Sequence, residues 1–77
     1  MTTAQLLSQF LKEKRKHANL TQPDLAIKAG VGLRFIRDIE QGKTSLRMDK
    51  VNQVLKLFGH ELGPISINRQ RLINEES

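Results

Sequence analysis

Apolar residues recur at helical spacing near the start of the chain and predict a helix over residues 3–18. Leu7, Phe10 and Leu11 are separated by three or four positions, so they fall on one face of an α-helix. Leu6 and Ala18 fall close to the same face, and polar residues occupy the remainder. We therefore expect an amphipathic helix that packs one face against a core.

Two shorter helices follow, joined by a tight turn. Thr21 has the hydroxyl of an N-cap residue, and Pro23 lies in the first turn, where backbone amides lack intrahelical partners. A helix therefore begins at residue 22, and Gly30 ends it because glycine readily takes a positive φ. The next helix begins at Gly32 or at residue 33, and Gly42 ends it.

These two helices have complementary inner and outer faces. The inward positions are Leu25, Ala26, Ala29, Val31, Ile36 and Ile39. The outward positions of the second helix are Arg34, Arg37, Asp38 and Gln41. Two helices packed around a glycine turn form a helix-turn-helix, which commonly reads DNA and also occurs as plain scaffolding.

A fourth helix is predicted over residues 46–58. Ser45 can cap its first turn, and Gly59 falls where a left-handed residue ends a helix. Its inward residues are expected to be Met48, Val51, Val54, Leu55 and Phe58. Residues 1–59 thus make one all-α, four-helix domain.

The apolar pattern then changes to a period of two, which predicts a short strand over residues 62–67. An isolated strand is unstable, so it needs a pairing partner, and a second copy of the chain is the obvious candidate. Pro64 restricts such pairing because it donates no hydrogen bond, so an irregular arm packed on the first helix is the alternative. We expect residues 60–67 to be a dimerisation arm and residues 68–77 a disordered tail. The dimerisation residues would be Leu62, Ile65 and Ile67.

Composition limits the class of protein. The 77 residues suffice for one small domain with about 3–5 kcal/mol of net stability. The chain has no Cys, and His17 and His60 do not have metal-ligand spacing. Neither a nucleophile elbow nor a glycine-rich phosphate loop is present, so we expect no enzymatic activity and no cofactor. Without a signal-peptide pattern or an apolar run of roughly 18 residues, we expect a cytoplasmic protein with no membrane contact.

Net charge adds a preference for polyanionic partners, although basicity alone suits RNA, anionic lipid or an acidic protein equally well. The net charge is +5. One basic group, Lys12, Lys14, Arg15 and Lys16, ends the first helix, where cations also complement the helix dipole. A second group lies in and just after the third helix, where the dipole does not explain the first two members. Its members are Arg34, Arg37, Lys43 and Arg47.

The order of residues in the helix-turn-helix resembles the lambda-repressor-like regulators, also called the XRE family. The matching positions are Gln22, Leu25, Ala26, Gly30, Val31, Ile36, Ile39, Glu40 and Gly42. This resemblance covers residues 10–58 and implies a four-helix domain that binds double-stranded DNA. Residues 34–62 are further similar to small antitoxins of the HipB type. That similarity implies dimerisation through a C-terminal strand and a HipA-like kinase toxin as a partner.

Base contacts are expected from the N-terminal half of the third helix, which enters the major groove in helix-turn-helix proteins. Arg34 can bond N7 and O6 of guanine together, Leu33 can meet a thymine methyl, and Arg37 can reach a base or a phosphate. Alternatively, Arg34 is simply solvated and Leu33 contacts a second copy or a toxin. Phe35 is either a core residue or an exposed contact.

The resemblance implies phosphate contacts and one ion pair. Gln22 matches a phosphate-clamping glutamine of the family, and Lys43 and Thr44 lie where the following loop approaches the DNA backbone. Arg15 and Glu40 match residues that form a partly buried ion pair in the family; otherwise they are independent surface charges. The expected DNA-binding set is Gln22, Gly32, Leu33, Arg34, Arg37, Lys43 and Thr44.

The leading hypothesis is therefore a homodimeric, sequence-specific repressor that binds an inverted-repeat operator and is the antitoxin of a HipA-like kinase, repressing its own operon. One alternative is a stand-alone phage-type repressor without a toxin. Another is a protein-interaction adaptor that has lost DNA binding. Arg34, Arg37 and Lys43 argue against the adaptor, which should have a neutral or acidic recognition face.

Overall fold

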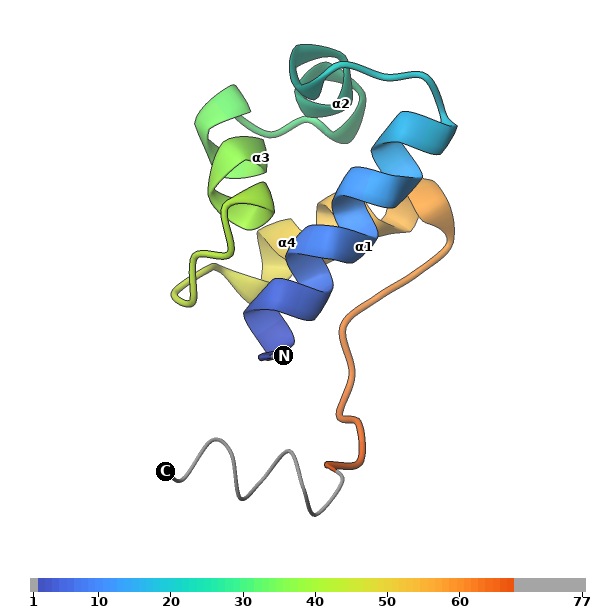
Figure 1. Cartoon of the computed structure of the whole chain (residues 1–77). Coiled ribbons are helices and arrows are strands. Elements are labelled where there is room, and N and C mark those ends of the chain that lie inside the picture. The colour runs from blue at the N-terminus through green and yellow to red at the C-terminus, as the bar shows by residue number, and fades with distance from the viewer. Residues whose placement is uncertain (1, 68–77) are drawn as a thin grey trace.

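The computed structural model describes residues 2–67 and shows four helices followed by an extended arm (Figure 1). The elements are α1 (Thr3–His17), α2 (Gln22–Ala29), α3 (Leu33–Glu40), α4 (Met48–Leu55) and the 3₁₀ turn η1 (Lys56–Phe58). The predicted all-α, four-helix architecture is confirmed over this part of the chain. None of these helices is both long and apolar enough to span a bilayer. The predicted disordered tail, residues 68–77, lies outside the described residues.

Threonine hydroxyls start the first two helices. The Thr21 hydroxyl accepts a hydrogen bond from the Asp24 amide at 3.1 Å, and the Asp24 carboxylate accepts one from the Thr21 amide at 3.1 Å. This reciprocal capping box satisfies two amides that lack helical partners. Thr2 and Gln5 form an equivalent box at the start of α1. The predicted N-cap at Thr21 is confirmed.

Glycines in the left-handed conformation follow α2, α3 and η1. Gly30, Gly42 and Gly59 have φ values of 73°, 80° and 71°. These angles suit glycine because it has no Cβ, and the three predicted helix ends are confirmed. By contrast, α1 ends at His17 and is followed by Asn19, whose φ of 57° makes it the one non-glycine residue with a positive φ among residues 2–67.

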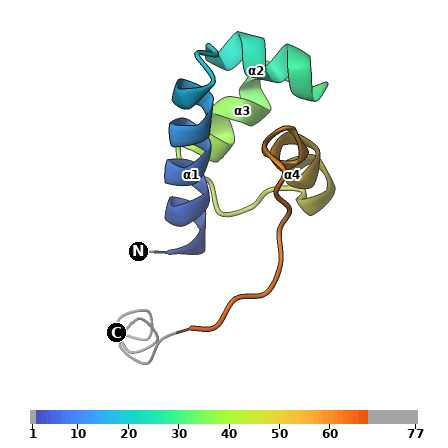
Figure 2. The same ribbon diagram turned by 90° about the vertical axis from the view of Figure 1, so that its right-hand side faces the viewer.

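The core lies where α1, α2, α3 and α4 meet (Figures 1 and 2). α3 packs against both α1 and α2, and α2 also packs against α4. Fully burying one large aliphatic side chain stabilises the fold by about 1.5–3 kcal/mol, so this small core supplies most of the driving force. Its buried apolar residues are Leu11, Leu25, Ala26, Ala29, Ile36, Ile39, Val51, Val54 and Leu55.

The start of α4 differs from the prediction. Arg47, not Ser45, is the N-cap residue, and it makes no side-chain capping bond. Met48 is 68% exposed and does not face inward, because Leu46 from the preceding loop packs against the core instead. Two further residues expected on the inner face of α1, Leu6 and Ala18, are also exposed, since they flank the buried stripe without lying on it.

The predicted strand is not present in the single chain. Residues 60–67 have no regular secondary structure, as expected for a segment without a second strand to receive its hydrogen bonds. The start of the arm contacts α1 and α4, whereas residues 63–67 are exposed, so the alternative of an arm packed on the first helix holds only in part. The His60 ring meets the Phe10 ring edge to face at 4.8 Å, and the Leu62 amide donates to Asn52 Oδ1 of α4 at 2.7 Å.

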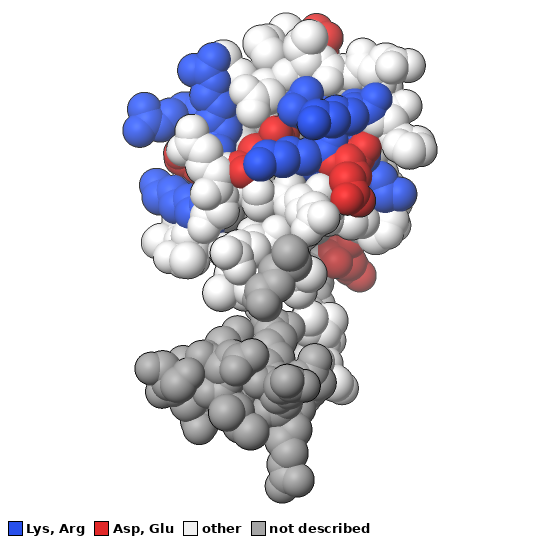
Figure 3. All heavy atoms as spheres, in the orientation of Figure 1, with Lys and Arg blue, Asp and Glu red and all other residues white. Residues whose placement is uncertain are grey.

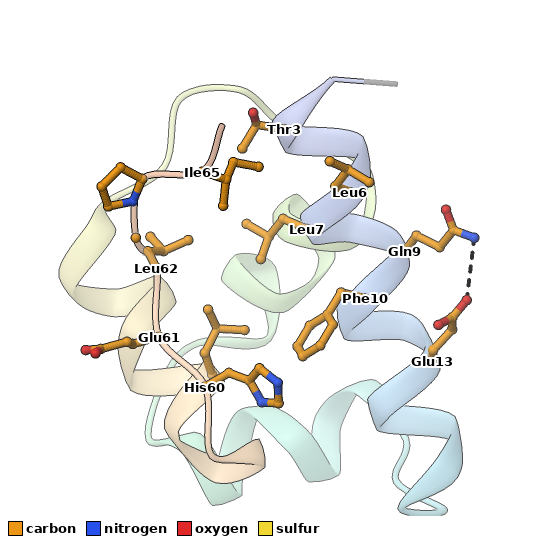
Figure 4. Close-up of a pocket in the computed structure, with 13 residues that line it drawn as sticks. Thr3, Leu6, Leu7, Gln9, Phe10, Glu13, His60, Glu61, Leu62 and Ile65 are labelled. Atoms are coloured by element: carbon orange, nitrogen blue, oxygen red, sulfur yellow. Dashed lines mark hydrogen bonds between the residues drawn. The ribbon is translucent and has the colours of Figure 1, made fainter. Parts of the chain in front are cut away.

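An apolar groove of about 590 Å³ lies between α1 and the arm. Leu7 and Phe10 of α1 form one wall, and His60, Leu62 and Ile65 come from the arm on the other side (Figure 4). Beyond Leu62 the arm is exposed, and its two isoleucines at positions 65 and 67 are 61% and 53% accessible. The helices therefore bury only part of the apolar surface of the arm.

Candidate nucleic-acid interface

The turn between α2 and α3 is fixed from two sides. The Val31 amide donates to the Ala26 carbonyl oxygen at 3.0 Å, which closes the end of α2. Gln53 of α4 donates from Nε2 to the carbonyl oxygens of Ala29 and Gly30 at 2.7 and 3.2 Å. Bonds from α2 and from α4 both hold the turn. The direction in which α3 leaves the turn is therefore fixed.

α3 has one buried face and one exposed face. Ile36 and Ile39 are 0% and 1% exposed and hold the helix on the core. On the opposite face the Arg34 side chain is 89% exposed, and Arg37 is exposed as well. In Figure 3, Lys and Arg side chains gather at the left edge, where Figure 1 places α3.

The flanking apolar residues of α3 have mixed environments. Leu33 and Phe35 are both half-buried and pack against the core. Phe35 thus combines the two alternatives that the sequence left open. Leu33 keeps part of its surface accessible at the first position of α3, beside Arg34. This placement is compatible with the predicted contact to a thymine methyl.

The start of α3 has no side-chain cap. Gly32 is the N-cap residue, with φ −71° and ψ 151°, and it has no side chain to accept from the first amides. Uncapped amides at a helix N-terminus suit a phosphate oxygen because they add hydrogen-bond donors to the positive end of the helix dipole. The predicted site residue Gly32 therefore lies at a position chemically suited to the DNA backbone.

Lys43 and Thr44 lie in the loop that leaves α3, and both are exposed. The Lys43 amide donates to the Asp38 carbonyl oxygen at 3.1 Å, and its ammonium lies 3.6 Å from Asp38 Oδ2. The loop is thereby tied back to α3. Lys43 is thus held close to the exposed face that carries Arg34 and Arg37.

Glu40 joins three helices through hydrogen bonds. Arg15 of α1 donates from Nε and Nη2 to the two Glu40 carboxylate oxygens at 2.8 and 3.0 Å. The Ser8 hydroxyl donates to the Glu40 carbonyl oxygen. The side chains of Arg15 and Glu40 are 15% and 2% exposed, so the two charges form a largely buried pair. Of the two alternatives stated from the sequence, the structure shows the partly buried ion pair and not two independent surface charges.

The side chain of Gln22 belongs to the same cluster. Its Nε2 donates to Glu40 Oε1 at 3.2 Å. A side-chain amide nitrogen carries two hydrogens, so one hydrogen remains for a phosphate oxygen. The predicted phosphate clamp would therefore be oriented by the buried carboxylate on α3.

Three residues that shape this surface were not singled out as site residues from the sequence. Ser8 bonds α3, Gln53 bonds the turn that precedes it, and Asp38 contacts both Arg34 and Lys43. Ser8 lies three residues before Leu11 on the inner face of α1, which was an available signal. Asp38 follows Arg34 by four residues, the usual spacing of a helical ion pair.

Together, the fixed turn and the cationic outer face of the second helix define a helix-turn-helix protein. Residues 11–63 match the profile of the family described as helix-turn-helix. The match spans more than half of the chain, which belongs to this family. The resemblance to XRE-type regulators is confirmed for this domain.

The chain is also similar to a bacterial regulator. It is 46% identical over 57 residues to the uncharacterized HTH-type transcriptional regulator y4mF of Sinorhizobium fredii (strain NBRC 101917 / NGR234). The alignment covers 74% of this chain and 75% of that relative.

Proposed function

We propose that this chain is a sequence-specific DNA-binding repressor of transcription. The observation that carries the proposal is the exposed face of α3, where Arg34 and Arg37 project from a helix held rigidly by the core, with Lys43 in the next loop. The relative in Sinorhizobium fredii is named as a transcriptional regulator, which supports the same function.

The proposal gives each exposed group a role. The N-terminal half of α3 enters the major groove, where Arg34 bonds a guanine edge and Leu33 meets a thymine methyl. Arg37 reaches a neighbouring base or phosphate. Contacts to the DNA backbone set the register without reading sequence. They come from Gln22, Gly32, Lys43 and Thr44.

Binding would require a dimer. α3 has eight residues and is about 12 Å long, so one copy reads only a few base pairs. Two copies related by two-fold symmetry would place their α3 helices about one DNA turn apart on an inverted repeat. We infer that the arms pair as strands between the two copies, through Leu62, Ile65 and Ile67. The exposure of both isoleucines supports this inference.

We also propose that the repressor is the antitoxin of a HipA-like kinase and regulates its own operon. This proposal follows from the resemblance to HipB-type antitoxins stated from the sequence of residues 34–62, whereas the family profile and the relative support only a DNA-binding regulator. A kinase that binds the operator-bound dimer more tightly than the free dimer should tighten operator binding by the same factor, because coupling between two binding sites is reciprocal. Operator affinity measured with and without the kinase encoded by a neighbouring gene tests this role. If the two proteins form no complex, the antitoxin proposal fails and the repressor proposal stands.

Selection from a library of randomised duplexes tests DNA recognition. We expect an inverted repeat, and a dimer that contacts on the order of 6–10 phosphates should lose about 10³–10⁵ in affinity between 50 and 200 mM salt. Arg34→Ala should flatten the preference at one position of each half-site, whereas Lys43→Ala should weaken all sequences alike. Equal binding to selected and scrambled duplexes would refute the proposal.

A further inference from the structure

Asp38 is a half-buried residue of α3 that lies beside two cations, Arg34 of the same helix and Lys43 of the next loop. Its Oδ1 is 3.5 Å from Arg34 Nε, and its Oδ2 is 3.6 Å from Lys43 Nζ. The Asp38 side chain is only 18% exposed, while those of Arg34 and Lys43 are 89% and 53% exposed. A carboxylate therefore occupies a surface that would otherwise be wholly cationic.

These two ion pairs should add little to the free energy of unfolding. Ion pairs with a solvent-exposed partner contribute little to folding, because water and salt screen them and because ordering two side chains costs entropy. A carboxylate facing DNA also repels phosphates. The orientation that Asp38 gives to the neighbouring Arg34 side chain is therefore the better explanation for its presence.

That geometry is specific for Arg34. A guanidinium carries five N–H donors, one on Nε and two on each Nη. The contact with Asp38 is made through Nε, so the two terminal nitrogens of Arg34 can bond a base without breaking it. These two nitrogens can bond the N7 and O6 atoms of one guanine together, which requires a fixed orientation of the guanidinium plane.

The position of Asp38 is itself fixed. Its side chain is only 18% exposed, and its carbonyl oxygen accepts the hydrogen bond from the Lys43 amide. This amide follows Gly42, whose φ of 80° turns the chain back toward α3. The carboxylate thus has much less freedom than the long side chain that it faces.

We propose that Asp38 is a positioning residue that sets sequence specificity by orienting Arg34. This inference rests on the proposed DNA binding. The carboxylate weakens binding to every duplex through repulsion and increases the difference between correct and incorrect bases, because an oriented Arg34 tolerates fewer alternatives. Specificity and overall affinity are therefore expected to respond to Asp38 in opposite directions.

The test is a binding-site selection with full-length wild-type protein, Asp38→Asn, Arg34→Ala and the double variant. Arg34→Ala first identifies the base position that Arg34 reads. At that position Asp38→Asn should lower discrimination by about five- to tenfold, a fraction of what a good bidentate contact provides. It should raise affinity for scrambled duplexes and steepen their salt dependence by about one charge per bound copy. In the Arg34→Ala background, Asp38→Asn should not change base preference.

Controls separate this proposal from the underlying function. Glu13→Gln removes the same charge from α1 and should leave base preference unchanged, and Asp38→Glu should restore part of the discrimination. Circular dichroism checks that each variant is folded. An unchanged preference in Asp38→Asn overturns the positioning role, as does a change that persists without Arg34, which would mean that Asp38 reads a base itself. If the wild-type protein selects no sequence, the proposed function fails first.

Discussion

Glu40 is a nearly buried carboxylate whose charge is balanced by the Arg15 guanidinium and which also accepts a hydrogen bond from the Gln22 amide. Arg15 spans both carboxylate oxygens, also donates to the Leu20 carbonyl oxygen at 3.0 Å, and so links the end of α1 to α3. A buried charge that loses its partner is much less stable than an apolar side chain in the same place. The consequences of substitution should therefore depend on which partner remains.

Arg15→Met should destabilise the fold by about 3 kcal/mol, because it leaves the Glu40 carboxylate buried with only the Gln22 amide to compensate it. Combining Arg15→Met with Glu40→Leu should recover much of that loss. Urea unfolding of the two single variants and the double variant gives the coupling free energy. Arg47→Met is the matched control, because its pair with Asp49 is largely exposed and should contribute less than about 1 kcal/mol. A coupling near zero for Arg15 and Glu40 would contradict the prediction.

Asp24 should give the α2 cap a dependence on pH. The hydrogen bond from the Thr21 amide, followed by that from the Thr21 hydroxyl, lowers the pKa of the Asp24 carboxyl below its usual value. A lowered pKa in the folded state means that the stabilisation is present above the pKa of the unfolded chain and is lost as pH falls through the folded value. Thermal unfolding should therefore show a smaller loss of stability on acidification in Asp24→Asn than in the wild type. Equal acid sensitivity in the two proteins would contradict this role of the cap.

At the scale of elements, the turn between α2 and α3 depends on Gly30 for two separate reasons. Its φ is 73°, and a Cβ at this position would lie 3.1 Å from Gln53 Nε2. Gly42 has a similar φ of 80°, but a Cβ there would meet no atom within 4 Å. Alanine at position 42 would therefore add backbone strain alone, whereas alanine at position 30 would add both strain and a close contact with Gln53.

Gly42→Ala should lower stability by about 1 kcal/mol, the strain of a left-handed alanine. Gly30→Ala should lower it further, since the Gln53 amide must shift by a few tenths of an ångström and so weakens its bonds to two carbonyl oxygens. Chemical denaturation compares the two variants directly. Equal losses would show that the Gln53 side chain adjusts without penalty.

Most of the helix boundaries were predictable because their causes are local. The Thr21 cap and the ends at Gly30 and Gly59 depend on residues within one turn of the chain. The start of α4 was not predictable, because Leu46 rather than Met48 packs on the core, and that choice depends on the path of the whole loop.

The contacts that support the site could not be predicted from the sequence, because they join residues that are far apart along the chain. The bonds from Ser8 to Glu40 and from Gln53 to Ala29 join residues that are 32 and 24 positions apart. A polar residue on an inner helix face signals that some partner exists but does not identify it. The pair of Arg15 and Glu40 was anticipated only through the family resemblance.

At the scale of the whole molecule, the exposed isoleucines of the arm predict how the chain associates. Ile65→Ser combined with Ile67→Ser should abolish the proposed dimer while preserving the fold, because both side chains are more than half exposed. Operator binding should then weaken by about 10²-fold or more, since the half-sites must be occupied independently. Sedimentation and operator titration measure the two effects.

The control for this prediction is Ile27→Ser. Ile27 is 80% exposed on α2, so its replacement removes a similar apolar side chain from a different surface. It should leave the dimer intact. If the arm variant remains dimeric, or if Ile27→Ser produces monomers, the interface lies on the helices and the arms do not pair.

The bond from the Leu62 amide to Asn52 has a thermodynamic consequence for such an assembly. Each residue that must be ordered at the moment of association costs about 1–2 kcal/mol of conformational entropy. Because Asn52 already anchors the first part of the arm during folding, only residues 63–67 would have to lose freedom when two arms meet. A side chain on α4, outside the arm, would in this way adjust the protein concentration at which the chain changes from monomer to dimer.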